Sequence, residues 1–263
     1  MTQSYKLAVF EQGQGEPLVM LHGLISTHRY WNQVIELIDQ AKWRVISLDL
    51  LGFGDSPKPK DGIYDLSQQV ASVDEAIAST AKPPYTVVGH SMGAITALKW
   101  AVDKPELFSR LILTSMPLLR PETVWQQLAS IADNERLFKR KSIAKAGVQS
   151  FAWLSILPAR VVTIQKRWPK HVAEDWTKHS RTSYKKTLDN IVFADELLEL
   201  LQQVKLPVHL VIGNRDGMID SHGVIQLTEI TKKNKNFIIQ IIDAAHNLPL
   251  EHPEIVARAI LRV

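Results

Sequence analysis

Residues 89–93, which read G-H-S-M-G, constrain the fold of this chain more than any other segment. They follow the apolar run 85–88 and precede a helical pattern over residues 94–101. A chain that passes from a strand directly into a helix must turn sharply, and the residue at the turn adopts a strained backbone conformation. The flanking residues must be small, because a side chain there would collide with the neighbouring strand or helix. The pattern therefore predicts a strand, a tight turn that lifts Ser91 clear of the backbone, and a helix.

Strand-like and helix-like patterns alternate along most of the chain. This alternation predicts an α/β fold with a doubly wound, mostly parallel sheet of about seven strands. We expect the strands at residues 5–10, 18–21, 43–48, 85–88, 110–114, 208–212 and 237–242. We expect helices at residues 27–38, 66–79, 94–101, 224–230 and 253–261. A tight turn is expected at 12–15, where the sequence is G-Q-G after a glutamine.

A long segment after the fifth predicted strand interrupts this alternation. Residues 118–190 show helical patterns without a clear strand and carry 14 Lys and Arg against 6 Asp and Glu, a net charge of +8. A helical insertion at this point would lie over the carboxyl ends of the strands, where such sheets bind ligands. We therefore expect residues 1–117 and 191–263 to form the core and residues 118–190 to form a helical cap. Its charge would attract an anionic substrate or an acidic carrier, or would simply be solvated and favour solubility.

Composition excludes several classes of protein. The chain of 263 residues has no cysteine, so disulfides, thiolate metal sites and a cysteine nucleophile are excluded. We find no secretory signal pattern and no apolar stretch of membrane-spanning length, and we expect a cytoplasmic protein. Neither a metal-ligand spacing nor the third glycine of a dinucleotide fingerprint is present, so we expect no metal and no cofactor. The basic excess lies in the predicted cap rather than in a recognised binding module, so nucleic-acid binding is not expected.

A serine hydroxyl on such a turn is activated when a histidine takes its proton and a carboxylate orients that histidine. Among the nine histidines, His246 follows the last predicted strand and should lie at the same sheet edge as Ser91. Asp216 follows the preceding strand at that edge, and Asp220 is the competing acid. An acid after the fifth strand is the other possible arrangement, but residues 115–117 carry no carboxylate. The order Ser91, Asp216, His246 is the order that this class of site requires.

With these residues identified, the chain resembles the α/β-hydrolases, and within them the small serine esterases and lipase-like members. The resemblance covers nearly the whole chain. It rests on five ordered motifs, namely His22-Gly23, residues 52–56 (G-F-G-D-S), residues 89–93, residues 213–216 (G-N-R-D) and Ala245-His246. It implies that the backbone N–H groups of Leu24 and Met92 form an oxyanion hole, because a tetrahedral oxyanion needs two preorganised donors. It also implies an additional first strand, for which little room remains ahead of Tyr5.

Together, the residues and the resemblance predict a serine hydrolase that cleaves small carboxylic esters through an acyl-enzyme. A carbon–carbon bond hydrolase is an alternative, although such enzymes usually carry a tryptophan where this chain has residues 247–249 (N-L-P). A cofactor-free lyase or perhydrolase with the same triad is another, and a non-catalytic ligand receptor of the same fold is a third. Haloalkane dehalogenases and epoxide hydrolases of this superfamily use an aspartate at the position of Ser91, so these activities are not expected.

Overall fold

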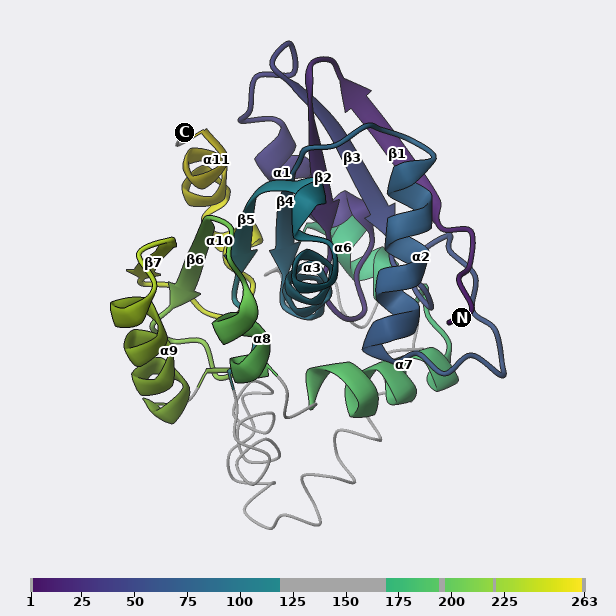
Figure 1. The fold of residues 1–263 in the computed structure, drawn as a ribbon. Helices are drawn as coiled ribbons and strands as arrows, with labels where there is room; N and C mark the ends of the chain where they lie inside the picture. The colour runs from purple at the N-terminus through teal and green to yellow at the C-terminus, as the bar shows by residue number, and fades with distance from the viewer. Residues whose placement is uncertain (1, 119–168, 194–196, 220, 262–263) are drawn as a thin grey trace.

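A seven-stranded sheet forms the centre of the computed structural model, which describes residues 2–118, 169–193, 197–219 and 221–261 (Figure 1). The strand order is β1-β3-β2-β4-β5-β6-β7. β1 runs antiparallel to β3, and every other neighbouring pair is parallel. The predicted fold class is therefore confirmed. The strands are β1 (Ala8–Gly13), β2 (Glu16–Leu21), β3 (Trp43–Asp49), β4 (Tyr85–His90), β5 (Phe108–Thr114), β6 (Val208–Gly213) and β7 (Phe237–Ile242).

Helices cover both faces of this sheet because successive strand residues point to opposite sides. In β2, Val19 and Leu21 pack into one apolar cluster, whereas Leu18 and Met20 pack into the other. The first cluster is covered by α2 (Leu66–Ala78), α3 (Met92–Asp103), α8 (Leu197–Gln203) and α9 (Ser221–Lys233). The second is covered by η1 (His28–Trp31), α1 (Asn32–Ile35), α10 (Leu248–Glu251) and α11 (Pro253–Leu261). A short 3-10 helix, η2 (Pro105–Leu107), leads into β5.

Several elements differ in extent from the sequence prediction: β2 begins at Glu16 rather than residue 18, β5 begins at Phe108 rather than residue 110, and α9 is longer than the predicted 224–230. The first strand begins at Ala8 rather than Tyr5, because its pairing with β3 starts at Ala8 while the backbone N–H of Tyr5 donates to the Ser72 hydroxyl. The helix expected at residues 27–38 begins as the 3-10 turn η1, capped by the Thr27 side chain, and α1 continues it only to Ile35. The sheet itself has the expected seven strands. None of the helices within the described ranges is long and apolar enough to span a bilayer.

Part of the predicted cap is described, and residues 119–168 of it lie outside the described residues. The described part contains α6 (Lys170–Asp175), α7 (Arg181–Thr187) and the π-helical turn η4 (Leu188–Val192). It contacts the loops that follow β2 and β3: Asp175 accepts hydrogen bonds from Thr27 and Arg29, and the Ser183 hydroxyl donates to the Gly52 carbonyl at 2.8 Å. In Figure 1, α7 lies beyond the arrowheads of the central strands. This part of the chain therefore lies at the carboxyl edge of the sheet.

Asp175 is the buried anchor of this contact. Its carboxylate accepts from the Thr27 hydroxyl at 2.6 Å and from Arg29 Nε at 2.9 Å, and a second guanidinium nitrogen binds its other oxygen. Asp175→Asn should lower the free energy of unfolding by about 2–3 kcal/mol, because charged hydrogen bonds to a buried group are lost. Urea denaturation measures this. Asp189→Asn is the control, because the pair of Asp189 with Lys185 is exposed and contributes less than about 0.5 kcal/mol. Equal losses in both variants would contradict the anchoring role.

Candidate active site

Ser91 occupies the turn between β4 and α3 with φ 53° and ψ −118°, a conformation that L-residues rarely adopt. The turn is crowded from both sides. A Cβ atom on Gly89 would lie 2.6 Å from Ala94 Cα, and one on Gly93 would lie 2.2 Å from the Leu21 carbonyl oxygen. Such contacts are too short for any side chain, which explains both glycines of the motif. The serine is held in a strained conformation at the carboxyl end of β4.

The two candidate oxyanion donors lie beside this serine. Met92 is the first residue of α3, so its N–H has no carbonyl one turn earlier in the helix to bind. Leu24 follows Gly23, and a Cβ on Gly23 would lie 3.2 Å from Ser91 Cβ. Within the described residues, neither N–H donates a hydrogen bond. His22 holds the Leu24 loop, because its Nδ1 lies 2.7 Å from the Gly23 carbonyl and its Nε2 accepts from the Leu50 N–H at 2.9 Å.

The three residues expected to form a triad are brought together. His246 Nε2 lies 3.0 Å from Ser91 Oγ, and His246 Nδ1 lies 3.0 Å from both carboxylate oxygens of Asp216. A carboxylate beside Nδ1 favours the tautomer that carries its proton there, which leaves the lone pair of Nε2 toward the serine. Asp216 is buried and also accepts from the Met218 N–H at 2.8 Å. The competing acid, Asp220, lies outside the described residues.

The loops after β6 and β7 carry Asp216 and His246, and backbone hydrogen bonds join them. The Arg215 N–H donates to the Ala244 carbonyl at 3.0 Å, and the Asn214 N–H donates to the Ile242 carbonyl at 2.9 Å. The two loops approach so closely that a Cβ on Gly213 would lie 2.2 Å from the Ala244 oxygen. The relative position of acid and histidine is thus fixed by the backbone rather than by side-chain packing alone.

A polar network behind the site was not anticipated from the sequence. The Tyr30 hydroxyl lies 3.0 Å from His90 Nε2 and donates to Asn247 Oδ1 at 3.2 Å, so it connects the β4 turn to the residue after His246. The Tyr30 and His90 rings also stack, with centroids 4.9 Å apart. No sequence signal pairs Tyr30, in η1, with Asn247, which precedes α10. His90 and His22 thus have structural roles beside the site.

Asp49 is a buried carboxylate that organises the neighbouring loop at residues 52–56. It accepts from the backbone N–H groups of His28 and Asp55, each at 2.7 Å, and lies 2.9 Å from His28 Nδ1. Burial alone would raise the pKa of Asp49, but the hydrogen bond from His28, the nearby His22 and these backbone donors hold it at about 2. The second motif of the sequence is therefore a structural support at the edge of the site.

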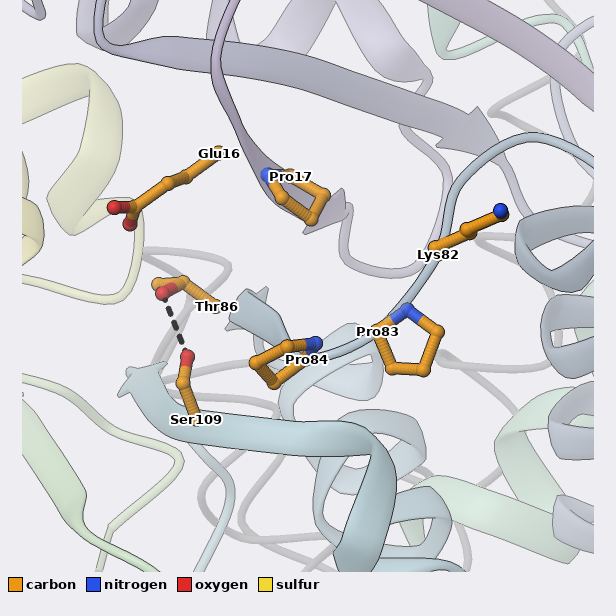
Figure 2. A pocket seen from close by; sticks show the side chains of 7 residues that line it. All are labelled: Glu16, Pro17, Lys82, Pro83, Pro84, Thr86 and Ser109. Atoms are coloured by element: carbon orange, nitrogen blue, oxygen red, sulfur yellow. Dashed lines mark hydrogen bonds between the residues drawn. The ribbon is translucent and has the colours of Figure 1, made fainter.

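A pocket of about 320 Å³ opens at the opposite edge of the sheet. Figure 2 shows its lining at the amino ends of β2, β4 and β5, with the Thr86 and Ser109 hydroxyls 3.0 Å apart. Parallel sheets of this kind bind ligands at the carboxyl ends of their strands, where Ser91 lies. We therefore do not assign this pocket to the site. No cluster of three or more potential metal ligands occurs within the described residues.

A family model described as the alpha/beta hydrolase fold matches residues 16–253. The chain belongs to this family. The match spans every strand from β2 to β7 and each of the five sequence motifs. Membership in this family supports the view that the chain is a hydrolase. The family resemblance seen in the sequence is confirmed.

Individual relatives are distant and have different names. A probable lysophospholipase, BODYGUARD 4 of Arabidopsis thaliana, is 26% identical over 231 residues, which cover 80% of this chain and 55% of that protein. A soluble epoxide hydrolase of Corynebacterium sp. is 33% identical over 116 residues, which cover 44% of this chain and 40% of that protein. The chain spans about half the length of the lysophospholipase-like relatives it matches. The solved structure of an Exiguobacterium antarcticum esterase has a TM-score of 0.73 at 18% identity and covers 98% of this chain and 94% of its own, a likeness of fold.

The buried histidines behind the site predict how stability responds to acid. Burial lowers the pKa of His22, and burial and the nearby His246 lower that of His90 well below 6.5. As the pH falls below about 6.5, the unfolded chain binds protons at these positions while the folded chain does not, so stability falls. Each histidine contributes up to about 1.4 kcal/mol per pH unit.

Urea denaturation at neutral pH and at about one pH unit below the unfolded pKa measures the slope of the free energy of unfolding against pH. In His90→Gln the slope should be smaller than in the native chain, because one proton-linked group is gone. His252→Gln, at a partly exposed position near the carboxyl terminus, is the matched control. An unchanged slope in His90→Gln would rule out His90 as a source of the acid sensitivity.

Proposed function

We propose that this chain is a serine hydrolase that cleaves carboxylic esters through an acyl-enzyme. The observation that carries the proposal is the unbroken series of contacts from Asp216 through His246 to Ser91, with each step at 3.0 Å. Nucleophile, base and orienting acid at hydrogen-bonding distance are the arrangement that activates a serine hydroxyl. The family contains hydrolases, which agrees with this chemistry.

In the first half of the reaction, Ser91 Oγ attacks the ester carbonyl carbon while His246 Nε2 takes the hydroxyl proton. The carbonyl oxygen becomes an oxyanion and accepts hydrogen bonds from the Leu24 and Met92 N–H groups. The tetrahedral intermediate then collapses. The alcohol leaves with the proton from His246, and the acyl group stays on Ser91. Asp216 holds the imidazole in the required tautomer and stabilises its positive charge.

In the second half, His246 removes a proton from water, and the resulting hydroxide attacks the acyl carbon. The oxyanion forms in the same hole, and its collapse expels Ser91 Oγ, which regains its proton from His246. The products are one carboxylic acid and one alcohol. Each group thus acts twice, and no step requires an oxidant or reductant.

The residue at the turn favours an acyl carbon over an epoxide as the site of attack. A serine that opened an epoxide would form an ether, which water does not hydrolyse under these conditions, so the enzyme would stop after one turnover. An acyl-serine is an ester and is hydrolysed by the route that formed it. Ser91 therefore separates this chain from the named activity of the epoxide hydrolase it resembles.

Residues 118–190 are proposed to cap this site, with residues 1–117 and 191–263 as the core. The contacts of Asp175 and Ser183 with loops at the carboxyl edge support the proposal for the described part. A cap over the serine would exclude water from the acyl-enzyme and would form one wall of the substrate site.

Triad substitutions test the proposal with p-nitrophenyl esters of several acyl lengths. Ser91→Ala and His246→Ala should remove nearly all turnover, because nucleophile and base act as a unit. Asp216→Asn should lower kcat by ~10⁴, as in serine proteases, because the imidazole is presented in the wrong tautomer. Circular dichroism and thermal unfolding confirm that each variant is folded.

Asp220→Asn is the matched control for the acid, because it removes the competing carboxylate four residues away. It should leave kcat within a few-fold of the native value. A severe loss in Asp220→Asn together with a nearly silent Asp216→Asn would reassign the acid. Full turnover in Ser91→Ala would refute the acyl-enzyme itself.

The basic charge of residues 118–190 makes a separate prediction about substrate charge. If the net +8 of this segment lies over the site, kcat/KM for an anionic ester should fall steeply with ionic strength. The Debye length shrinks from ~30 Å at 0.01 M to ~8 Å at 0.15 M, so salt screens the long-range attraction between the basic segment and an anionic ester. A neutral ester of the same acyl length is the control and should change little. Equal responses of the two esters would mean that the charge serves solubility rather than the substrate.

A further inference from the structure

The edge strand β7 exposes an unusually apolar sequence. Its six residues read F-I-I-Q-I-I, and the side chains of Ile238 and Ile241 are 55% and 57% exposed. Natural sheet edges are usually protected by a charge, a proline or a bulge. β7 has no charged residue or proline and pairs with β6 in continuous register, whereas the opposite edge strand, β1, carries Glu11 and ends at Gly13. Figure 1 shows β7 at the outer margin of the sheet beside β6.

Among the described residues, nothing donates to or accepts from the backbone groups on the outer side of β7. The Asn236 carbonyl accepts a hydrogen bond from the Val208 N–H, and the Ile242 carbonyl accepts one from the Asn214 N–H. The even-numbered residues of this segment therefore point their backbone N–H and C=O groups toward β6 and the loop that follows it. In a parallel pair of strands, the odd-numbered residues that alternate with them point their N–H and C=O groups away from β6. Ile239 and Ile241 therefore offer two donors and two acceptors at the open edge.

We propose that two copies of this chain pair through antiparallel β7 strands about a two-fold axis at Gln240. Residues 238–242 read I-I-Q-I-I, which is a palindrome, so the strand is complementary to its own reversed copy. In this register Ile239 faces Ile241 of the second copy, and these residues are the ones whose backbone groups point away from β6. The two Gln240 side chains face each other, and no glutamine is opposite an isoleucine. The strand carries no charge, so pairing brings no repulsion within it.

The same register covers the exposed side chains. Ile239 packs against the apolar cluster on the face of the sheet that α9 covers, and Ile242 packs against the cluster on the face that α11 covers, so both are partly buried. Ile241 would lie against Ile239 of the second copy, and Ile238 against Ile242, so each exposed isoleucine meets a partly buried one. Beyond the strand, Lys235 would lie diagonally across from Asp243 of the second copy, an opposite-charge contact within reach of a lysine side chain.

Sedimentation velocity over a wide range of protein concentration gives the first test. The native chain should show a concentration-dependent dimer. Gln240→Lys sets two like charges directly opposite each other at the axis and should raise the dimer dissociation constant by ~10-fold or more. Gln202→Lys, an exposed position on α8 with the same change in charge, is the matched control and should sediment like the native chain.

Cysteine cross-linking tests the register, because the native chain has no cysteine to interfere. Gln240 would be a non-hydrogen-bonded pair with Cα atoms about 4.5 Å apart, within the range of a disulfide. Under mild oxidation Gln240→Cys should form covalent dimers far faster than Ile239→Cys or Ile241→Cys. Gln202→Cys reports the rate of random collision.

Three results would overturn the proposal. A native chain that stays monomeric at every concentration would show that two copies do not pair through β7. A dimer that Gln240→Lys does not weaken would use another surface. Cross-linking of Gln240→Cys no faster than Gln202→Cys, or fastest at position 239 or 241, would exclude pairing centred on Gln240. None of these measurements depends on the proposed hydrolase activity.

Discussion

The rest of the structure depends on the strained backbone of Ser91. Holding a non-glycine residue at φ 53° costs about 1–3 kcal/mol, which the surrounding structure must supply. It does so through close packing, because the α3 N-terminus lies directly against the end of β2 at Gly93 and the turn folds tightly onto itself at Gly89. The same packing sets Met92 and the Leu24 loop beside the serine. One steric constraint thus positions both the proposed nucleophile and the proposed oxyanion donors.

The partners of Ser91 are positioned by a second, independent device. Asp216 and His246 lie on consecutive loops that share backbone hydrogen bonds, so their separation does not depend on long side chains. Tyr30 then connects this pair of loops to the β4 turn through Asn247 and His90. Preorganisation of this kind matters because a misplacement of about 1 Å can lower the rate ~10²-fold. These hydrogen bonds preorganise the proposed triad, and Asp175 joins the described part of residues 118–190 to Thr27 and Arg29 at the same edge of the sheet.

Much of this arrangement could be predicted from the sequence, because local rules decide it. The glycines around Ser91, the apolar strand runs and the position of His246 after the last strand each have a direct steric or periodic signature. The start of β1 was misplaced by three residues, because pairing with β3 rather than local propensity decides where that strand begins. The link from Tyr30 to Asn247 and the anchor from Asp175 to Arg29 could not be predicted, since both join residues more than 140 positions apart without a shared motif.

The central claim is that Ser91 is a nucleophile activated by His246, and covalent labelling with a fluorophosphonate tests it most directly. The reagent reacts rapidly with an activated serine, and mass spectrometry of the digested protein identifies the labelled residue. We expect one label per chain, on Ser91, with labelling nearly abolished in His246→Ala. Labelling of a different serine, or equal labelling of the native chain and His246→Ala, would contradict the claim.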